Sequence, residues 1–169
     1  MTIDWFMLLA PLILLPIVAL LAFRGCYSPV YYYPNLQVNI KSIFQTTAVT
    51  AKWTFVDNTA STIGTLSRSP SPPWPPDPVN DSVSSVDNTT ILFLTSENAF
   101  QTIIANNPTV VSCECDVTDI AGTVKHLFPS QNPITYSSDS STGTLVWLLT
   151  RNLDKPSNPQ DGYTFELQG

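Results

Sequence analysis

Two patterns of hydrophobic and polar residues divide the chain. The first is a continuous apolar run, Trp5–Phe23, which contains no charged residue. As an α-helix this run would be roughly 28 Å long, close to the thickness of the hydrocarbon core of a bilayer. It therefore predicts a membrane-spanning segment or an export signal. The second pattern begins at Leu36, where apolar and polar residues alternate with period two, as expected for half-buried β-strands.

The alternating pattern predicts a series of short strands and one helix. We expect strands over residues 36–40, 47–56, 62–66, 91–95, 109–120, 123–128, 134–136, 144–150 and 163–167, and a helix over 96–105. Short strands separated by turns are typical of an antiparallel β-sandwich of the immunoglobulin-like or jelly-roll type. The expected fold class is mainly β, with an N-terminal single transmembrane helix, a β-sandwich and a long Pro-rich loop.

Several details of the sandwich also follow from the pattern. The connection 45–47 is too short for a parallel crossover, so the first two strands are expected to pair antiparallel. The continuous apolar run 91–95 predicts a central strand, and Ser96 is expected to cap the helix that follows. Alternation turns Cys113 and Cys115 to one face of their strand, where we expect them to be small buried hydrophobic residues.

The segments differ enough in composition to suggest boundaries. We divide the chain into an anchor (1–26), a Tyr/Pro-rich linker (27–35) and a β-sandwich domain (36–169) that contains a Pro-rich loop (67–88). Tyrosine and tryptophan are enriched in protein interfaces, so the candidate interaction surface consists of Tyr31, Tyr32, Tyr33 and Trp74. Plainer interpretations remain open for both segments: the linker is a stiff spacer, and Trp74 folds back onto the domain or onto a neighbouring subunit. The functional alternative for the Pro-rich loop is a polyproline II ligand for an aromatic groove.

The apolar run has the features of a membrane helix that packs against a partner. Trp5 and Phe6 precede the run's aliphatic part and Phe23 ends it, which matches the aromatic belts of membrane proteins. Pro11 and Pro16 predict a bend, because each removes a helical hydrogen bond. Neighbouring helices satisfy the freed carbonyls in lipid, so these residues are candidates for partner packing.

Three fates of the N-terminal segment are compatible with the sequence. A cleaved signal is disfavoured because no basic residue precedes Trp5 and the run is long for a signal. Gly25-Cys26 resembles the lipidation site of exported bacterial envelope proteins, with Arg24 departing from that pattern, so Cys26 is a candidate for lipidation. We favour a retained single-pass helix, with the polar domain on the extracytoplasmic side of the membrane.

Charge excludes one class of partner. The net charge is −6, with only 7 Lys and Arg residues against 13 Asp and Glu residues. Such a chain repels phosphate backbones, so we expect no nucleic-acid partner. Only 12% of the residues are charged, a balance typical of exported β-proteins and of subunits packed in larger assemblies.

The sequence offers little material for catalysis. His126 is the single histidine, and no nucleophile motif accompanies it, so we expect a surface position and no enzyme. Glu114, Asp116 and Asp119 cluster without the spacing of a calcium loop. The C-x-C pair lacks the second ligand pair of a zinc site, so we expect no metal and no cofactor.

These observations favour a non-catalytic function. We expect a membrane-anchored structural or accessory subunit of a larger membrane, envelope or virion assembly, with lipid and other protein subunits as partners. The alternative is an anchored extracytoplasmic module, held by the helix or as a lipoprotein, that binds a glycan, a protein or a calcium ion.

Overall fold

The computed structural model describes residues 33–70, 89–135, 143–152 and 162–169. These residues belong to one unit, Tyr32–Gly169. The predicted anchor, most of the predicted linker and most of the Pro-rich loop lie outside the described residues. Within the described ranges, no helix has the length and apolar character needed to cross a membrane.

Four strands form one sheet, named here the β1 sheet. Its strands are β1 (Asn35–Ile40), β4 (Thr89–Phe93), β8 (Thr144–Arg151) and β9 (Tyr163–Gln168), in the order β4-β1-β8-β9. β1 pairs antiparallel with β4 but parallel with β8, and β8 pairs antiparallel with β9. The sheet is therefore mixed, with β4 and β9 at its edges.

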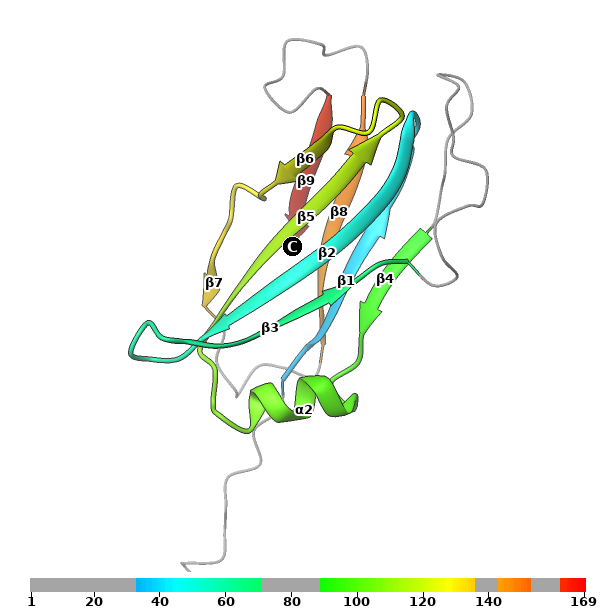
Figure 1. The fold of residues 1–169 in the computed structure, drawn as a ribbon. Helices are drawn as coiled ribbons and strands as arrows, with labels where there is room; N and C mark the ends of the chain where they lie inside the picture. Colours follow the sequence, from blue (N-terminus) through cyan, green and yellow to red (C-terminus); the bar gives the residue numbers. More distant parts are fainter. Residues whose placement is uncertain (1–32, 71–88, 136–142, 153–161) are drawn as a thin grey trace, which may run out of the picture. The chain divides into compact units, whose positions relative to one another are not determined.

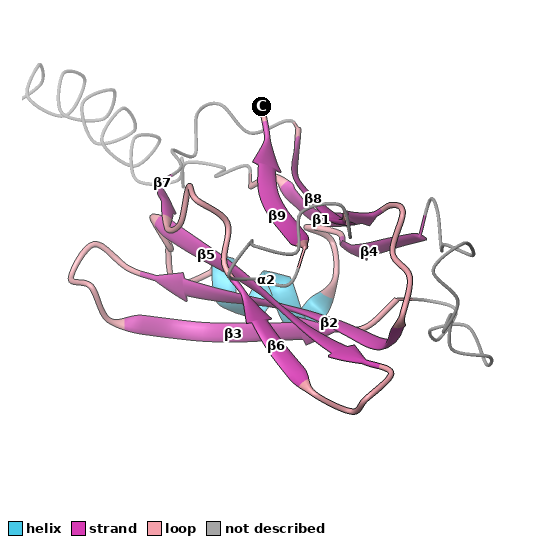
Figure 2. Cartoon of the chain, turned by 90° about the horizontal axis from the view of Figure 1, so that it is seen from above, coloured by secondary structure: helices cyan, strands magenta, loops and turns pink. Residues whose placement is uncertain are grey.

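The remaining strands form the β2 sheet, which faces the first. Its main strands are β2 (Thr46–Val56), β3 (Thr62–Arg68), β5 (Val110–Asp119) and β6 (Val124–Leu127), in the order β3-β2-β5-β6. β7 (Ile134–Thr135) pairs with the start of β5, and every pairing in this sheet is antiparallel. Figure 2 shows the two sheets as separate layers. α2 (Asn98–Ile104) lies at one end of the strands (Figure 1).

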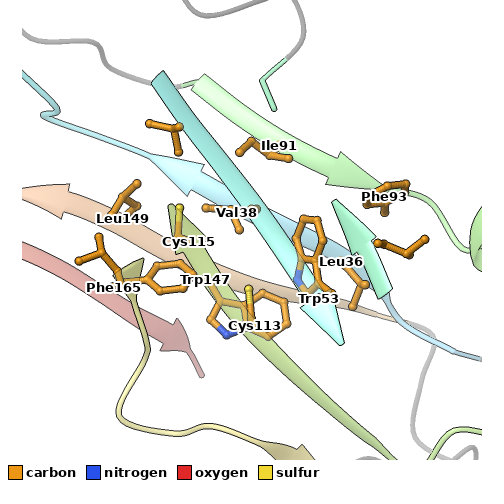
Figure 3. Packing of buried hydrophobic residues seen from close by; sticks show 14 of the residues in the cluster. Leu36, Val38, Trp53, Ile91, Phe93, Cys113, Cys115, Trp147, Leu149 and Phe165 are labelled. Atoms are coloured by element: carbon orange, nitrogen blue, oxygen red, sulfur yellow. The ribbon is translucent and has the colours of Figure 1, made fainter. Parts of the chain in front are cut away.

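Aromatic side chains fill the space between the sheets. The Trp53 ring lies edge-on to Phe93 and to Trp147, with ring centroids 5.5 and 6.3 Å apart, respectively. Figure 3 shows the two indoles between the layers, beside Cys113. Both indole Nε1 atoms are buried without a hydrogen-bond partner. Aromatic packing therefore outweighs hydrogen bonding at the centre of this core.

The mainly β prediction is confirmed. Each strand expected from period-two alternation is present, with ends shifted by a few residues. The inward positions of β5 are fully buried, as predicted for Cys113 and Cys115. β5 and β6 form a hairpin, and His126 is exposed, as predicted.

Three details of the predicted pairing are wrong. β1 and β2 do not pair, because the short connection 41–45 crosses from one sheet to the other. Ser42 and Gln45 adopt left-handed φ values of 52° and 51° in this crossing, which a simple strand alternation does not reveal. β4 is an edge strand, not a central one, and β1 and β8 are parallel.

The predicted helix is present, but its cap differs from the prediction. The N-cap is Glu97, not Ser96, and its side chain makes no capping hydrogen bond. The Glu97 carboxylate instead accepts hydrogen bonds from Arg68. α2 turns Phe100 and Ile103 into the core, so tertiary contacts position this short helix.

Candidate interaction surface

Exposed hydrophobic residues lie along the β5–β6 hairpin, from its turn to the residue after β6. Of the large hydrophobic side chains that are exposed in the described ranges, three belong to the β5–β6 hairpin and the residues after it: Ile120, Val124 and Phe128, at 48, 49 and 51% exposure. We call these three residues the hairpin patch. Val124, His126 and Phe128 alternate along β6 and its extension, which places them on the outward side.

The hairpin that carries the patch is held by its own turn. Asp119 Oδ1 accepts hydrogen bonds from the backbone N–H groups of Ala121 and Thr123, each at 2.9 Å. Gly122 has φ +80°, a conformation that favours glycine. The Ile120 N–H donates to the Gln45 carbonyl at 3.3 Å, which ties the turn to the β1–β2 connection. The Ile120 side chain is thus exposed on an ordered backbone.

Paired ionisable groups lie on the same outward face as the patch. His126 Nδ1 and Asp116 Oδ1 are 2.6 Å apart, across the β5–β6 pair. Lys52 forms an ion pair with Glu114, its direct neighbour across β2 and β5. The Glu114 carboxylate, hydrogen-bonded to Lys52, raises the pKa of that ammonium above its ordinary value. The outward face is therefore polar, with its apolar part concentrated at the hairpin.

The carboxylates predicted to cluster have separate partners. Glu114 pairs with Lys52, Asp116 contacts His126, and Asp119 accepts backbone N–H groups of the turn. Among the residues that the structure describes, no group of three metal-ligating side chains occurs. The arrangement can supply a polar rim to a contact surface.

The two thiols of the described domain are inaccessible. Cys113 and Cys115 are free and fully buried on the inner face of β5. Burial raises the pKa of both thiols, so they stay protonated and behave as small hydrophobic residues.

Arg151 is a buried residue that the sequence interpretation missed. Its Nη1 donates to the carbonyls of Phe44 and Gln45 at 2.7 and 3.1 Å, and its guanidinium lies 4.6 Å from the centroid of the Tyr163 ring. The Tyr163 hydroxyl lies 2.9 Å from Thr46 Oγ1. The available signal was the period-two alternation of β8: Arg151 follows Trp147 and Leu149 on the buried face of the strand. These contacts hold the β1–β2 connection in place, and the Ile120 N–H of the hairpin turn donates a hydrogen bond to Gln45 of the same connection.

Of the residues predicted to form the interaction surface, the structure describes only Tyr33. Tyr33 is 6% exposed and belongs to the core of the domain. The other predicted anchor, interaction and lipidation residues lie outside the described ranges: Trp5, Phe6, Pro11, Pro16, Phe23, Cys26, Tyr31, Tyr32 and Trp74. Their predicted roles stay predictions.

The hairpin patch was also missed from the sequence. Leu127 and Phe128 are adjacent and have opposite orientations, so an apolar residue falls on each face of this strand. That departure from alternation was the available signal. Comparison of this chain with protein-family models, with curated proteins and with solved structures gave no match.

Proposed function

We propose that this chain is a non-catalytic, membrane-anchored structural or accessory subunit of a larger membrane, envelope or virion assembly. In this proposal Trp5–Phe23 is the single-pass anchor, and the β domain lies on the extracytoplasmic side. A partner subunit covers the hairpin patch.

The observation that carries the proposal is the exposed hairpin patch. Complete burial of an aliphatic or aromatic side chain contributes about 1.5–3 kcal/mol, so covering the exposed half of each patch residue contributes roughly 1 kcal/mol. The ordered turn lowers the entropic cost of that contact. An apolar centre with the Lys52–Glu114 and Asp116–His126 pairs beside it matches the composition of a protein interface.

The position of the patch along the strands supports contact with another subunit. The N-terminal segment joins the domain at Tyr33, whose carbonyl accepts a hydrogen bond from Thr95, near the start of α2. The β5–β6 hairpin lies at the opposite end of the strands (Figure 1). Ile120 and Val124 at the turn are therefore remote from Tyr33, and Phe128 lies part-way along β5, next to the Leu127–Cys115 pair.

The proposal includes no catalytic step. Both described thiols are buried with raised pKa values, so the proposal gives them a packing role only. The type of sandwich, immunoglobulin-like or jelly-roll, stays a prediction. Both types consist of antiparallel sheets, whereas β1 and β8 pair in parallel, so the described pairing favours neither type.

The test is extraction of the native protein in mild detergent, followed by measurement of the mass and stoichiometry of the complex. We expect the wild type to carry another subunit in a fixed ratio. Phe128→Glu should lose that subunit, because a carboxylate would be buried at the contact.

Thr65→Glu is the matched control. Thr65 is exposed on β3, at the opposite edge of the same sheet, so this variant should retain the subunit. A wild-type chain that purifies without another subunit, or equal retention by both variants, would overturn the proposal. Thermal unfolding of each variant verifies that the domain is intact.

A further inference from the structure

We propose that a second copy of this chain packs against the outward face of the β1 sheet. This inference deepens the proposed function, on which it rests, by naming one subunit of the assembly and the surface that it uses. The hairpin patch, on the other sheet, is left free for a different subunit.

The outward face of the β1 sheet differs in charge from that of the β2 sheet. Within its four strands the outward positions include a single ionisable side chain, Glu166, whose carboxylate accepts a hydrogen bond from Ser130. The β2 sheet exposes four ionisable groups in the two pairs already described. A chain of net charge −6 approaches its own copy with least repulsion through a nearly uncharged face.

Two neighbouring rows of this face have matching chemistry. In one row Leu92, Gln37 and Val146 lie side by side on β4, β1 and β8. In the next row the same strands carry Thr90, Asn39 and Leu148. Each row therefore has an amide at the centre and an aliphatic residue on β8. Leu92, Val146 and Leu148 are half-buried and point away from the core.

The two amides leave complementary groups at the centre of the face. Gln37 Nε2 donates to Asn39 Oδ1 at 2.6 Å, and Thr90 Oγ1 donates to the same oxygen at 3.3 Å. Within the described part of the chain, Asn39 Nδ2 and Gln37 Oε1 make no hydrogen bond of their own. One copy thus presents a donor and an acceptor on adjacent outward positions of one strand.

A two-fold axis satisfies both groups at once. If the axis lies in the plane of contact, across the strands and between the two rows, Gln37 faces Asn39 of the partner subunit. The same operation places Val146 against Leu148 of the partner subunit. A two-fold contact uses the same patch on both copies, so a donor beside an acceptor and one aliphatic residue beside another are self-complementary.

The size of the face predicts a weak dimer. Four strands about 4.8 Å apart, with a rise of ~3.3 Å per residue over about six residues, cover a projected area of roughly 400 Å². Counted on both copies, this area is roughly 800 Å², below the ~1,200–2,000 Å² of stable protein–protein interfaces, so the contact is a weak, transient one. Attachment of both copies to one membrane would raise their effective concentration and favour the dimer.

The test uses the full-length chain in mild detergent, with the dimer fraction measured by analytical ultracentrifugation over a range of protein-to-detergent ratios. We expect the wild type to show a monomer–dimer equilibrium. Leu148→Lys alone and Val146→Glu alone should each raise the dimer dissociation constant at least tenfold. A mixture of the two variants should recover dimer, because the introduced lysine faces the introduced glutamate across the axis.

Thr54→Lys and Ser112→Glu are the matched controls, because these residues are paired outward positions on central strands of the β2 sheet. Both should dimerise as the wild type does. Recovery of dimer in the mixture also shows that the Leu148→Lys and Val146→Glu variants are folded. Leu148→Thr is a milder second variant, which should also weaken the dimer.

Several outcomes would overturn the inference. A wild type that is monomeric at every protein-to-detergent ratio would overturn it, as would a Leu148→Lys dimer with the dissociation constant of the wild type. A mixture of the two variants that contains no more dimer than either variant alone would also overturn it. So would a Leu148→Lys variant whose only change is the loss of bound lipid or of another protein. Phe128→Glu separates the two proposals, because it should lose the other subunit and keep the dimer.

Discussion

At the scale of single residues, Arg151 shows how this domain accommodates a buried cation. The side chain belongs to a residue that is 9% exposed, and no described carboxylate pairs with it. Two backbone carbonyls and the Tyr163 ring face the guanidinium instead, and Nε has no hydrogen-bond partner. Buried charge is tolerated only with such compensation, so Arg151 and the β1–β2 connection depend on each other.

Removal of Arg151 should therefore be costly. We expect Arg151→Ala to lower the free energy of unfolding by about 2–3 kcal/mol, because two carbonyls lose a charged donor. Urea unfolding of the full-length chain in mild detergent measures this change. Lys41→Ala is the control, since Lys41 is exposed, and should change stability by less than about 0.5 kcal/mol. Equal stability of the two variants would contradict a structural role of Arg151.

The buried thiols allow a second test at the same scale. Because burial raises their pKa, Cys113 and Cys115 should resist iodoacetamide at pH 8 in the folded protein. Both should react once the protein is unfolded in urea. Peptide mass spectrometry locates the modified residues. Rapid labelling of either thiol without denaturant would show that the core opens or that β5 faces the other way.

At the scale of elements, Arg68 joins three parts of the chain at one side of the sandwich. From β3 its Nη1 donates to the Leu92 carbonyl of β4, and its guanidinium pairs with Glu97 at the start of α2. The guanidinium also lies 4.0 Å from the centroid of the Phe93 ring. Arg68 thereby links the two edge strands β3 and β4, which belong to different sheets.

This link predicts a specific pH dependence. The Arg68 guanidinium lowers the pKa of Glu97 below its ordinary value of about 4.3. The contribution of Glu97 to stability is present above that value and is lost as pH falls through the lower folded pKa. The melting temperatures of wild type and Glu97→Gln should therefore differ at pH 7 and converge in acid. A difference that is constant down to pH 3 would contradict the proposed pair.

The contact of α2 with β3 can be tested by a double-mutant cycle. A Cβ added at Gly64 would lie 3.0 Å from Ile103 Cγ1, so Gly64→Ala should cost roughly 1 kcal/mol of stability. In the Ile103→Ala background the same change should be neutral or stabilising, because the obstructing side chain is gone. Urea unfolding of the four proteins measures the coupling. Additive effects would indicate that α2 does not pack against β3.

Alternation predicted the strands but not their neighbours. Period two identifies which side chains are buried, as at Cys113 and Cys115, whatever strand lies alongside. Pairing depends on where each connection leads, and the connection 41–45 uses left-handed residues to change sheets. A strand placed at an edge also keeps a buried face, so the apolar residues of β4 gave no indication of its position.

At the scale of the whole molecule, the division of the chain into an anchor, a linker and a domain stays a prediction, because residues 1–32 lie outside the described ranges. The contrast between Trp5–Phe23 and the alternating region suggested a boundary between an anchor and a domain. The predicted interaction surface consists of tyrosines and Trp74, whereas three of the four large hydrophobic residues exposed in the described ranges belong to the β5–β6 hairpin and the residue after it. Ile120, Val124 and Phe128 share this hairpin only because the turn folds β6 back along β5, which composition alone does not reveal.

The central claim is that this chain is a membrane-retained subunit of a larger assembly. Native mass spectrometry of the protein, extracted from its own membrane in mild detergent, tests this claim most directly. We expect a chain that still contains Trp5–Phe23 and carries another subunit in a fixed ratio, which Phe128→Glu releases. A chain that begins at an acylated Cys26, or one that is recovered without any other subunit, would contradict it.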